Sequence, residues 1–540
     1  MQDEAQGSFS RTGLAGYEAP FMRQRLAGFG DPLMSVLLVV SDADEIWIKG
    51  SISSVLGQTY PYVELCVCDN ASRRPHVSEV LEECASSDNR VKVCRLRGLA
   101  LTAEAYGKAL SLSTGRFVTL LGEGDKLVPE ALSRMVKLLQ HTEADVVYSD
   151  EDSVDISDRP SNTIFKPYWS PDMLLSIPYV GRPCVIRKDI VEELGGFRDG
   201  FESAEEYDLM LRVAEKTDRI HHLPGVLYHR RVYEREPARE EHIAREVLEC
   251  AVGEALERRA LEAKVEPGPA PDSVRVVRSL PVRSTVSVVA LVTETDLLDY
   301  ARKLEQSTSY PIREVIPAGV GEGVVLGEGS VNGASTARVA NLAADQATGE
   351  YLLFVRDFQR ATSPDWIAWL LRQAQRPEVG AVGGRVLNSG GGTRSAGSYQ
   401  LSLSRLTGSP ESALSQEEPS RFLPVVSHPF NPYAVSVECM MVRRSVFESA
   451  SGFDEGNLPT NFYDLDLSFR IREKGLLNVY TPDASLFSKD FDRPLPRVEE
   501  IEYMWERWWA MLVKALYYKG SLLAAEGESL DDDLLPLVSV

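Results

Sequence analysis

The order strand, helix, strand occurs twice in this sequence, and that repetition constrains the fold more than any other feature of the chain. In the first copy, short apolar runs typical of buried strands alternate with longer stretches typical of helices. The expected elements are a strand, a helix, two strands, a helix and a strand, at residues 35–40, 46–56, 63–68, 91–96, 103–112 and 116–121. Because a helix between two strands allows parallel pairing, residues 35–121 predict one half of a doubly wound α/β domain.

The second copy starts near residue 285 and repeats both the elements and short motifs. Its expected strand, helix and two further strands are at residues 285–292, 297–304, 310–316 and 348–355. The motif Gln58-Thr-Tyr-Pro-Tyr-Val-Glu64 is similar to Ser307-Thr-Ser-Tyr-Pro-Ile-Arg-Glu314, and Ser113-Thr-Gly-Arg-Phe-Val118 is similar to Ala347-Thr-Gly-Glu-Tyr-Leu352. These matching points lie about one domain length apart, which indicates tandem copies of one fold rather than a solenoid.

A stretch rich in Pro and Gly, Glu266-Pro-Gly-Pro-Ala-Pro-Asp272, separates the two copies and predicts a linker. The 540 residues are also too many for one hydrophobic core. We therefore expect an N-terminal extension, a first domain, a linker, a second domain, and a C-terminal helix with an acidic tail, at residues 1–33, 34–264, 265–284, 285–500 and 501–540.

The charge balance argues against one large class of partner. The chain has 58 basic and 80 acidic residues, a formal net charge of −22, which opposes binding to nucleic acid and to anionic lipid. No apolar run in the sequence approaches the ~20 residues of a membrane-spanning helix, and the first residues lack the basic and apolar regions of a signal peptide. We expect a cytoplasmic protein without a transmembrane segment. Peripheral contact with the inner face of a membrane stays open.

Polar residues follow two of the expected strands. Asp69 comes directly after the strand at 63–68, and Gly122-Glu-Gly-Asp125 comes directly after the strand at 116–121. Ligands of doubly wound sheets lie beyond the carboxyl ends of the strands. The sequence therefore predicts a binding site at this edge of the first sheet.

Longer motifs follow one another in both halves. In the first half they are Ser54-Val-Leu-Gly-Gln-Thr-Tyr-Pro61, Val147-Tyr-Ser-Asp-Glu-Asp152, Phe165-Lys-Pro-Tyr-Trp-Ser-Pro-Asp172, Gly195-Gly-Phe-Arg198 and Tyr207-Asp-Leu-Met-Leu-Arg212. In the second half they are Ala434-Val-Ser-Val-Glu-Cys-Met-Met-Val-Arg-Arg444, Gly452-Phe-Asp-Glu455, Tyr463-Asp-Leu-Asp-Leu-Ser-Phe-Arg470 and Asn478-Val-Tyr-Thr-Pro-Asp483. At these residues the chain resembles tandem-domain family 2 glycosyltransferases of bacterial O-antigen and other surface-polysaccharide pathways. The resemblance covers about Ser35 to Tyr518 and implies two GT-A-like nucleotide-diphospho-sugar transferase domains, each a mixed, mostly parallel sheet flanked by helices.

The resemblance also implies a reaction. Such enzymes are expected to move a sugar, here of hexosyl or rhamnosyl type, from a nucleotide-diphosphate donor to a glycan or lipid-linked acceptor with inversion at the anomeric carbon. They need a carboxylate for the nucleotide, an Asp-x-Asp pair that holds Mg²⁺ or Mn²⁺ on the diphosphate, and a general base. The metal matters because the leaving diphosphate gains negative charge in the transition state.

The first domain keeps part of this pattern. The resemblance places Asp69 on the nucleotide and Asp42 in the first loop of the donor site. Gly122-Glu-Gly-Asp125 stands where the family has Asp-x-Asp-Asp, so Asp125 is the one remaining candidate ligand for a metal or for the diphosphate. Gly107 replaces an Asn that usually contacts the donor. We therefore expect a weakened cation site.

The general-base motif is better kept. Glu206 falls at the base position with Asp208 beside it, and His229 matches a histidine that contacts the diphosphate or the metal in relatives. A Glu in place of an Asp extends the reach of the base by roughly 1 Å.

Each of these residues also has an ordinary structural interpretation. Asp69 can cap a helix, Glu206 and Asp208 can form a solvated first turn, and His229 can be a packed histidine. The acidic run Asp150-Glu-Asp152 can either replace the lost metal ligands or belong to a turn or helix cap.

The second domain departs from the pattern differently. Gly319 stands in place of the nucleotide Asp, and Arg356-Asp357-Phe358 in place of the metal motif. Ser395 and Ser488-Lys489 replace further histidines. The remaining candidate site residues there are Asn341, Asp357, Asp464 and Asp466.

The aromatic-rich stretch Tyr503 to Tyr518 has two interpretations. Its aromatic residues are typical of a helix at a membrane interface, whereas its acidic surroundings and its match to the closing helix of the family favour docking on the protein core.

Three functional hypotheses remain. The first is an active glycosyltransferase. The second is a catalytically inactive relative that acts as a scaffold for a partner glycosyltransferase or a glycan. The third is a metal-independent transferase in which Arg356 or Lys126 neutralises the diphosphate.

Overall fold

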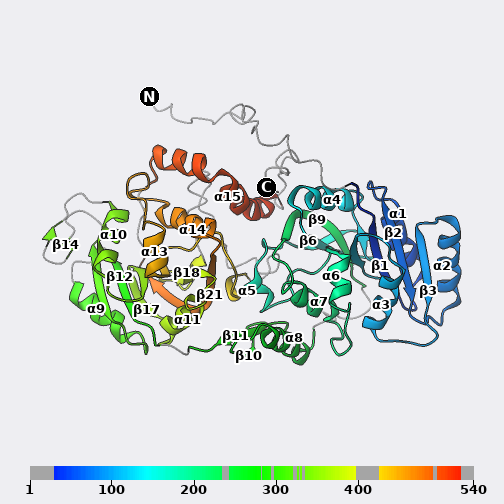
Figure 1. Ribbon diagram of the computed structural model, residues 1–540, viewed down its shortest axis with the longest axis horizontal. Helices are drawn as coiled ribbons and strands as arrows, with labels where there is room; N and C mark the ends of the chain where they lie inside the picture. The colour runs from blue at the N-terminus through cyan, green and yellow to red at the C-terminus, as the bar shows by residue number, and fades with distance from the viewer. Residues whose placement is uncertain are drawn as a thin grey trace.

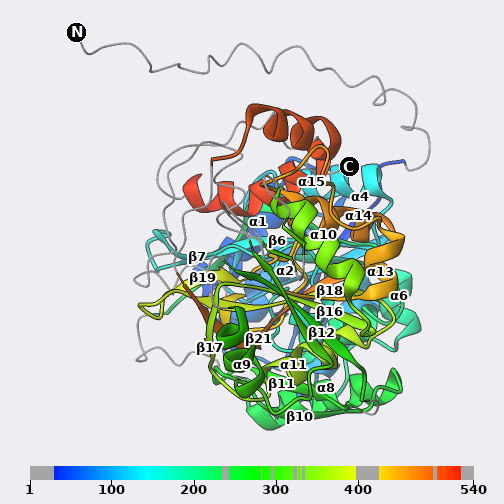
Figure 2. The same ribbon diagram turned by 90° about the vertical axis from the view of Figure 1, so that its left-hand side faces the viewer.

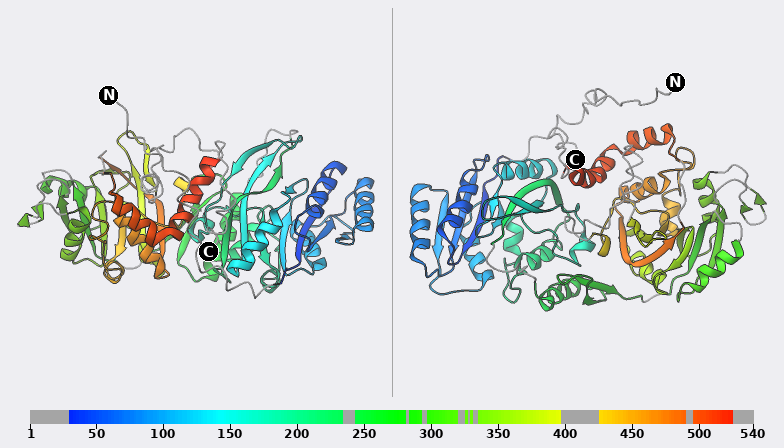
Figure 3. Two further views of the ribbon diagram at one scale, coloured as in Figure 1. Left: turned by 90° about the horizontal axis from the view of Figure 1, so that it is seen from above. Right: turned by 180° about the vertical axis from the view of Figure 1, so that it is seen from behind.

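The two copies predicted from the sequence form two α/β domains that lie side by side (Figure 1), and the predicted fold is confirmed. A computed structural model describes residues 30–233, 243–280, 283–292, 297–319, 325–326, 329–330, 335–396, 425–489 and 495–524. Most of the predicted N-terminal extension and the acidic tail lie outside these residues. Seen from above and from behind, the domains keep this arrangement (Figure 3).

The first domain is built around a mixed sheet. Its elements are β1 (Met34–Val40), α1 (Glu45–Leu56), β2 (Val63–Asp69), α2 (Pro75–Ser87), β3 (Val91–Arg95), α3 (Thr102–Leu112), β4 (Phe117–Leu121), β5 (Lys126–Leu127), α4 (Ala131–Thr142), β6 (Val146–Val154), β7 (Pro160–Ile164), α5 (Pro171–Leu174), β8 (Cys184–Arg187), α6 (Lys188–Glu193), α7 (Glu205–Val213), β9 (Ile220–Arg231) and α8 (Arg245–Arg258). The strand order is β3-β2-β1-β4-β8-β6-β9-β5, with β7 paired to β6. Strands β3, β2, β1 and β4 run parallel, and β8 is antiparallel to β4 and β6.

The second domain repeats this order. Its elements are β12 (Val286–Val292), α9 (Leu297–Gln306), β13 (Glu314–Gly319), β14 (Val325–Leu326), β15 (Gly329–Ser330), α10 (Thr336–Gln346), β16 (Tyr351–Arg356), β17 (Phe358–Ala361), α11 (Trp366–Ala374), β18 (Val379–Leu387), β19 (Thr393–Ala396), the 3₁₀ turn η2 (Val425–Ser427), β20 (Cys439–Arg443), α13 (Arg444–Ser449), α14 (Tyr463–Glu473), β21 (Leu477–Ser488) and α15 (Val498–Ala524). The sheet order is β13-β12-β16-β20-β18-β21-β17, with β19 paired to β18. The β14–β15 pair stands apart from this sheet.

Each sheet is covered by helices on both faces, as the apolar strands require. In β1, Leu37 faces the cluster that contains α3, α6, α7 and α8, whereas Val36 and Leu38 face the cluster that contains α1, α2 and α4. In the second domain, α10, α13, α14 and α15 pack on one face, and α9 and α11 pack on the other (Figure 2).

The motifs that recur in the two halves make the same contact in each domain. Glu64 accepts hydrogen bonds from Ser35 Oγ at 2.7 Å and from the Thr114 amide at 2.5 Å. In the second domain, Glu314 accepts from Ser287 Oγ at 2.6 Å and from the Thr348 amide at 2.7 Å. The carboxylate thus joins the first two strands of each sheet to the turn before β4 in the first domain and before β16 in the second.

The glycine after that threonine has a packing reason. A Cβ on Gly115 would lie 2.5 Å from Ser35 Oγ, and a Cβ on Gly349 would lie 2.6 Å from the Ser287 amide nitrogen. The Thr-Gly pair is therefore required by the close approach of this turn to the first strand of each sheet.

Part of the segment expected to be a linker forms secondary structure. Strands β10 (Ala263–Pro267) and β11 (Val274–Arg278) form an antiparallel hairpin across the Pro- and Gly-rich stretch. Val274 is buried, and its amide donates to Ser176 O at 2.9 Å. Figure 3 shows α8 and this hairpin along one edge of the two domains. The apolar residues of β11 supply the packing that the Pro- and Gly-rich composition did not predict.

A buried carboxylate joins the two domains. Asp172 of the first domain accepts hydrogen bonds from Arg376 Nη1 at 2.6 Å and from Asn431 Nδ2 at 2.7 Å, both in the second domain. Its Oδ1 also lies 3.6 Å from Arg278 Nη2, in the hairpin. Burial tends to raise the pKa of Asp172, but Arg376 and Arg278 outweigh it and lower that pKa. Phe430 and Tyr480 of the second domain extend the apolar cluster of the first.

The C-terminal helix α15 docks on the second domain along its first half. Met504, Trp508 and Leu512 are buried in the same cluster as α14, and Trp508 Nε1 donates to Asp466 at 2.8 Å. Among the described residues, no helix is both long and apolar enough to cross a membrane.

We expect Glu64→Gln to lower the free energy of unfolding by about 1.5–3 kcal/mol at pH 7, because an amide brings its own donors toward the donors that Glu64 now satisfies. Burial tends to raise the pKa of Glu64, but Lys92, Thr114 and Ser35 overcome it and lower the pKa from 4.5 to about 2. The stabilisation is complete above pH 4.5 and is lost as the pH falls toward 2. Urea unfolding at pH 7 and pH 3.5 measures both effects, with the exposed Glu79→Gln as the matched control. Equal unfolding midpoints for the two variants would contradict this role.

Candidate functional site

The carboxyl ends of β1, β2 and β4 meet at one edge of the first sheet, where the sequence predicts a site. The loop after β1 contacts the loop after β4, because the Ser41 amide donates to Glu123 Oε2 at 2.7 Å. It also contacts the loop after β2, because the Asp42 amide donates to Ser72 Oγ at 3.1 Å. The predicted site residues of the first domain fall into two groups around these loops.

The first group is Asp42 and Asp69, at the predicted nucleotide side. Asp69 is 1% exposed, accepts from the Ser72 amide at 2.8 Å, and lies 3.1 Å from Arg95 Nε. Asp42 accepts from the amides of Arg73 and Arg74 at 2.6 and 3.0 Å, and these amides lower its pKa. Helix α2 begins at Pro75 without a side-chain cap. Asp69 therefore fixes the loop before the helix rather than capping it.

The second group is centred on Arg182, between β7 and β8. Its Nε lies 2.9 and 3.1 Å from the two carboxylate oxygens of Glu206, and its Nη2 donates to Glu206 and, at 3.0 Å, to Tyr106 Oη. Its Nη1 lies 3.6 Å from Asp125 Oδ2. Burial opposes the charge of Arg182, but Glu206 outweighs it and raises the pKa of the guanidinium. One cation thus connects the loop after β4 to the predicted base.

Asp125 is engaged by protein groups at both oxygens. Tyr228 Oη donates to Oδ2 at 2.5 Å, and the Arg231 amide donates to Oδ1 at 2.8 Å. Burial raises the pKa of Asp125, against the opposing effect of Arg182 and Tyr228. The carboxylate is 6% exposed as a residue. It is therefore a buried structural group of the loop in this conformation.

The residues present do not fit a divalent cation. Magnesium and manganese need several oxygen ligands at about 2.0–2.2 Å. A Cβ on Gly122 would lie only 2.0 Å from Asp125 Oδ2 and 2.5 Å from Arg182 Nη1, so an aspartate there would have to displace both groups. In the described part of the chain, no group of three or more His, Cys, Asp or Glu side chains is placed to hold a metal ion.

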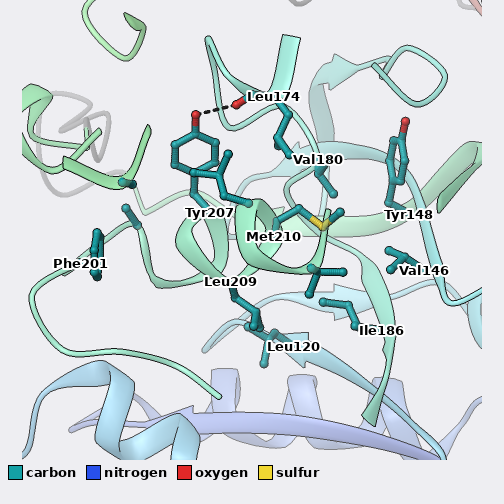
Figure 4. Packing of buried hydrophobic residues seen from close by; sticks show 14 of the residues in the cluster. Leu120, Val146, Tyr148, Leu174, Val180, Ile186, Phe201, Tyr207, Leu209 and Met210 are labelled. Atoms are coloured by element: carbon teal, nitrogen blue, oxygen red, sulfur yellow. Dashed lines mark hydrogen bonds between the residues drawn. The ribbon is translucent and has the colours of Figure 1, made fainter. Parts of the chain in front are cut away.

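Helix α7 fixes the position of Glu206 through its buried face. Tyr207 Oη donates to Leu174 O at 2.6 Å, and Leu209 and Met210 lie in the apolar cluster beneath the helix (Figure 4). Glu206 lies in the first turn of α7 between the buried residues Glu205 and Tyr207, but its own side chain is 34% exposed. A ligand can therefore reach it without unfolding of the helix.

Asp208, beside the predicted base, has a structural role. It is fully buried and binds Arg198 and Arg212, the latter through Nη2 at 2.7 Å. Arg212 in turn donates to Leu194 O at 2.9 Å and to Gly196 O at 2.8 Å. The carboxylate thus orients an arginine that holds the glycine loop. Asp208 is therefore not part of a solvated turn.

Asp466 makes the same contact in the second domain. It binds Arg470 through Nη2 at 2.7 Å, and Arg470 donates to Gly452 O at 2.8 Å and to Ala450 O. The Asp-x-x-x-Arg spacing repeated in α7 and α14 is therefore a feature of the fold.

His229, Lys126 and the acidic run Asp150-Glu-Asp152 lie further along the site edge. His229 Nδ1 contacts Asp152 Oδ1 at 2.6 Å, and Lys126 Nζ contacts Asp158 Oδ2 at 2.8 Å. The acidic run is part of strand β6, not of a turn or helix cap. Each of these charges already has a partner in the protein.

In the second domain the candidate residues are also committed to the fold. Asn341 Nδ2 donates to Phe453 O at 2.9 Å, and Asp464 accepts from the Val437 amide at 3.1 Å. Asp357 is 3% exposed and lies 3.7 Å from Arg356 Nε. Gly319 pairs with Val292 as Asp69 pairs with Val40, so it occupies the strand position of the missing nucleotide carboxylate.

A separate cavity of about 970 Å³ lies between the domains. Its walls include Trp169, His222, Asn431, Tyr433 and Arg472, and none of the candidate site residues named above lines it. The cavity and the strand-end site are therefore distinct places in the molecule.

Arg182 and Glu123 are the residues of this site that the motifs did not reveal as important. Arg182 belongs to no family motif and meets Glu206 and Asp125 only through the fold. Glu123 is surrounded by Asp42, Asp44 and Asp125. Burial is the largest of the effects that raise its pKa from 4.5 to about 7. In the sequence, only the acidic residues near Glu123 could have indicated its raised pKa.

Residues 35–190, which lie in the first domain, match the family described as "Glycosyl transferase family 2". The prediction of the family is therefore confirmed. The chain is 33% identical over 495 residues to "O-antigen biosynthesis protein RfbC" of Myxococcus xanthus, an alignment that covers 87% of this chain and 38% of that protein. It is 31% identical over 560 residues to "Uncharacterized protein y4gI" of Sinorhizobium fredii, covering 94% and 61%.

The chain thus spans less than two thirds of the length of both relatives. Among solved structures, S. aureus TarS in complex with UDP-GlcNAc superimposes with a TM-score of 0.35 at 19% identity, over 42% of this chain and 66% of that one.

We expect Asp208→Ala to lower the free energy of unfolding by about 3–5 kcal/mol, because it leaves two arginines without their shared buried partner. The exposed Glu257→Ala, on the neighbouring helix α8, should change it by less than about 0.5 kcal/mol. Chemical denaturation measures both. A small loss of stability accompanied by a loss of ligand binding would instead place Asp208 in the site.

The raised pKa of Glu123 predicts a pH effect. A carboxyl group whose pKa is higher in the folded state favours folding when it is protonated, so stability should fall as the pH rises from 4.5 through about 7. Glu123→Gln should remove this fall and exceed the parent in stability at pH 8. Urea unfolding at pH 5.5 and pH 8 tests it, with the exposed Glu82→Gln as the control. Parallel pH profiles for parent and Glu123→Gln would show that the carboxyl titrates normally.

Proposed function

We propose that the first domain transfers a hexosyl or rhamnosyl group from a nucleotide-diphosphate sugar to a glycan or lipid-linked acceptor in surface-polysaccharide synthesis. The family match over residues 35–190 and the similarity to a protein named for O-antigen biosynthesis support this class of reaction. The observation that carries the proposal is the position of Glu206, a partly exposed carboxylate at the strand-end edge beside the loop that follows β4.

In the proposed reaction, the acceptor oxygen attacks the anomeric carbon as the bond from that carbon to the diphosphate oxygen breaks. The diphosphate leaves with the electron pair, and Glu206 takes the acceptor proton. Attack from the face opposite the leaving group inverts the anomeric centre. Asp42 and Asp69 support this step indirectly, because they hold the 72–74 loop at the nucleotide side.

Glu206 must first loosen its contact with Arg182 to serve as the base, since two of the guanidinium nitrogens now hold its carboxylate. A bound diphosphate provides a competing anion for the guanidinium. Donor binding and release of the base are therefore linked in this proposal.

A second candidate function is a catalytically inactive scaffold that binds a partner glycosyltransferase or a glycan. The engagement of Asp42, Asp69 and Asp125 by protein groups favours it. Calorimetric titration with a panel of nucleoside diphosphates separates the two functions. Binding of one of them to the strand-end site supports the transferase, and absence of any binding supports the scaffold.

For the transferase, Glu206→Gln should lower turnover of the nucleotide sugar by roughly 10²–10⁴-fold, because an amide cannot accept the acceptor proton. Nucleoside-diphosphate affinity should stay within a few-fold of the parent. The exposed Glu202→Gln, three residues before α7, is the control for folding and charge. Turnover by Glu206→Gln at the parent rate would show that another group is the base.

A further inference from the structure

A positively charged side chain of the protein lies against the loop after β4. Arg182 reaches this loop from the segment before β8 and contacts groups on three other segments: Asp125, Tyr106 and Glu206. Its side chain is 23% exposed, so the charge is largely desolvated but still open to a ligand. Among the described residues, its Nη1 makes no hydrogen bond and lies 3.6 Å from Asp125 Oδ2.

Gly122 and Arg182 depend on each other. The Cβ of any residue at position 122 would meet Asp125 Oδ2 at 2.0 Å and Arg182 Nη1 at 2.5 Å. Glycine therefore leaves the space that the guanidinium and the Asp125 carboxylate now share. Arg182 thus lies at the place where a carboxylate at position 122 would need its space.

The second domain also has an arginine at the corresponding place, but on the other strand of the pair. Phe117 pairs with Arg187, and Tyr351 pairs with Arg443, so these pairs mark equivalent points of the two sheets. Counting five residues forward from Phe117 and Tyr351 gives Gly122 and Arg356.

Counting five residues back from Arg187 and Arg443 gives Arg182 and Glu438. Of these four positions, the arginine is at residue 182, before β8, in the first domain and at residue 356, at the end of β16, in the second. Arg356 is 7% exposed and lies 3.7 Å from Asp357 Oδ2, much as Arg182 lies beside Asp125. The positive charge is common to both copies, although the strand that supplies it is not.

We infer that Arg182 takes the place of a divalent cation, so that the first domain binds the diphosphate of its donor without Mg²⁺ or Mn²⁺. This inference rests on the function proposed above. The N–H groups of the guanidinium donate to the diphosphate oxygens and stabilise the charge that develops as the anomeric bond breaks. No proton leaves Arg182 in this step, and the acceptor proton still goes to Glu206.

Calorimetric titration of the full chain with UDP, GDP, dTDP, ADP and CDP tests the inference, once with EDTA and once with Mn²⁺. We expect at least one of these to bind with an affinity that differs less than about threefold between the two conditions. An increase of tenfold or more with Mn²⁺ would overturn the role of Arg182 and leave the proposed function intact. Failure of every diphosphate to bind in either condition would overturn the proposed function itself.

Variants of Arg182 locate the charge. In EDTA, Arg182→Gln should bind the selected diphosphate at least tenfold more weakly than the parent, and Arg182→Lys should show a smaller loss because it keeps the charge but not the fork of donors. Arg219→Gln, at an arginine paired with Asp145 away from this edge, is the matched control. Thermal melting confirms that each variant is folded, and Arg182→Lys decides the outcome if Arg182→Gln is not. Parent-like binding by a folded Arg182 variant would overturn the inference.

The double variant Gly122→Asp/Arg182→Gln tests directly whether Mn²⁺ can replace the charge of Arg182. It adds a carboxylate beside Asp125, whose side chain must shift to admit the new Cβ, and it removes the competing cation. Diphosphate binding should therefore become dependent on Mn²⁺. Electron paramagnetic resonance of added Mn²⁺ provides a readout that does not need activity. A double variant that holds no Mn²⁺ and still binds the diphosphate in EDTA would contradict the role of Arg182 as a substitute for the cation.

Discussion

The contact of the Arg182 guanidinium with Glu206 and Asp125 determines what the strand-end edge of the first domain can do. A guanidinium has a fixed charge, a fixed set of donors and a permanent covalent anchor, whereas a metal ion arrives from solution and is lost to a chelator. The site therefore has its positive charge whenever the chain is folded. The same contact restrains the carboxylate that the proposed chemistry needs, so the proposed binding and the proposed catalysis both depend on how Arg182 divides its donors.

The fold of the two domains was largely predictable from the sequence, because apolar runs and repeated motifs indicate local structure. The strands around Cys66 and Leu120 were found at the expected places, and the repeated Thr-Gly pairs lie at matching points of the two domains. The roles of single residues were less predictable, since a role depends on contacts between distant segments. Arg182 meets Glu206 only after β8 has been placed beside β4. Asp208 looked like part of the chemistry because its neighbour does, yet burial between two arginines makes it a structural group. The β10–β11 hairpin was not predicted because the Pro- and Gly-rich composition indicated a linker, although a few apolar residues of β11 pack against the protein.

The two domains show which parts of a repeated fold resist change. Glu64 and Glu314 make the same hydrogen bonds, and Asp208 and Asp466 orient equivalent arginines. These contacts lie in the interior, where removal of one partner leaves a buried group unsatisfied. The strand ends and the loops that follow them differ between the domains, with Asp69 and Gly122 in the first and Gly319 and Arg356 in the second. Loops tolerate such changes because their backbone lies at the surface of a rigid scaffold.

The buried Asp172, held by Arg376, Asn431 and Arg278, has a consequence for how this chain can evolve. The second domain contributes to the first through that contact whatever its own strand ends can bind. Substitutions that remove binding groups around Gly319 or Arg356 leave the junction untouched, so such a domain can lose its chemistry and still be retained. Conversely, a shortened gene encoding the first domain alone would leave Asp172 in a newly exposed surface beside apolar side chains, a poor start for an independent protein. The contact at Asp172 therefore favours keeping both domains in one chain.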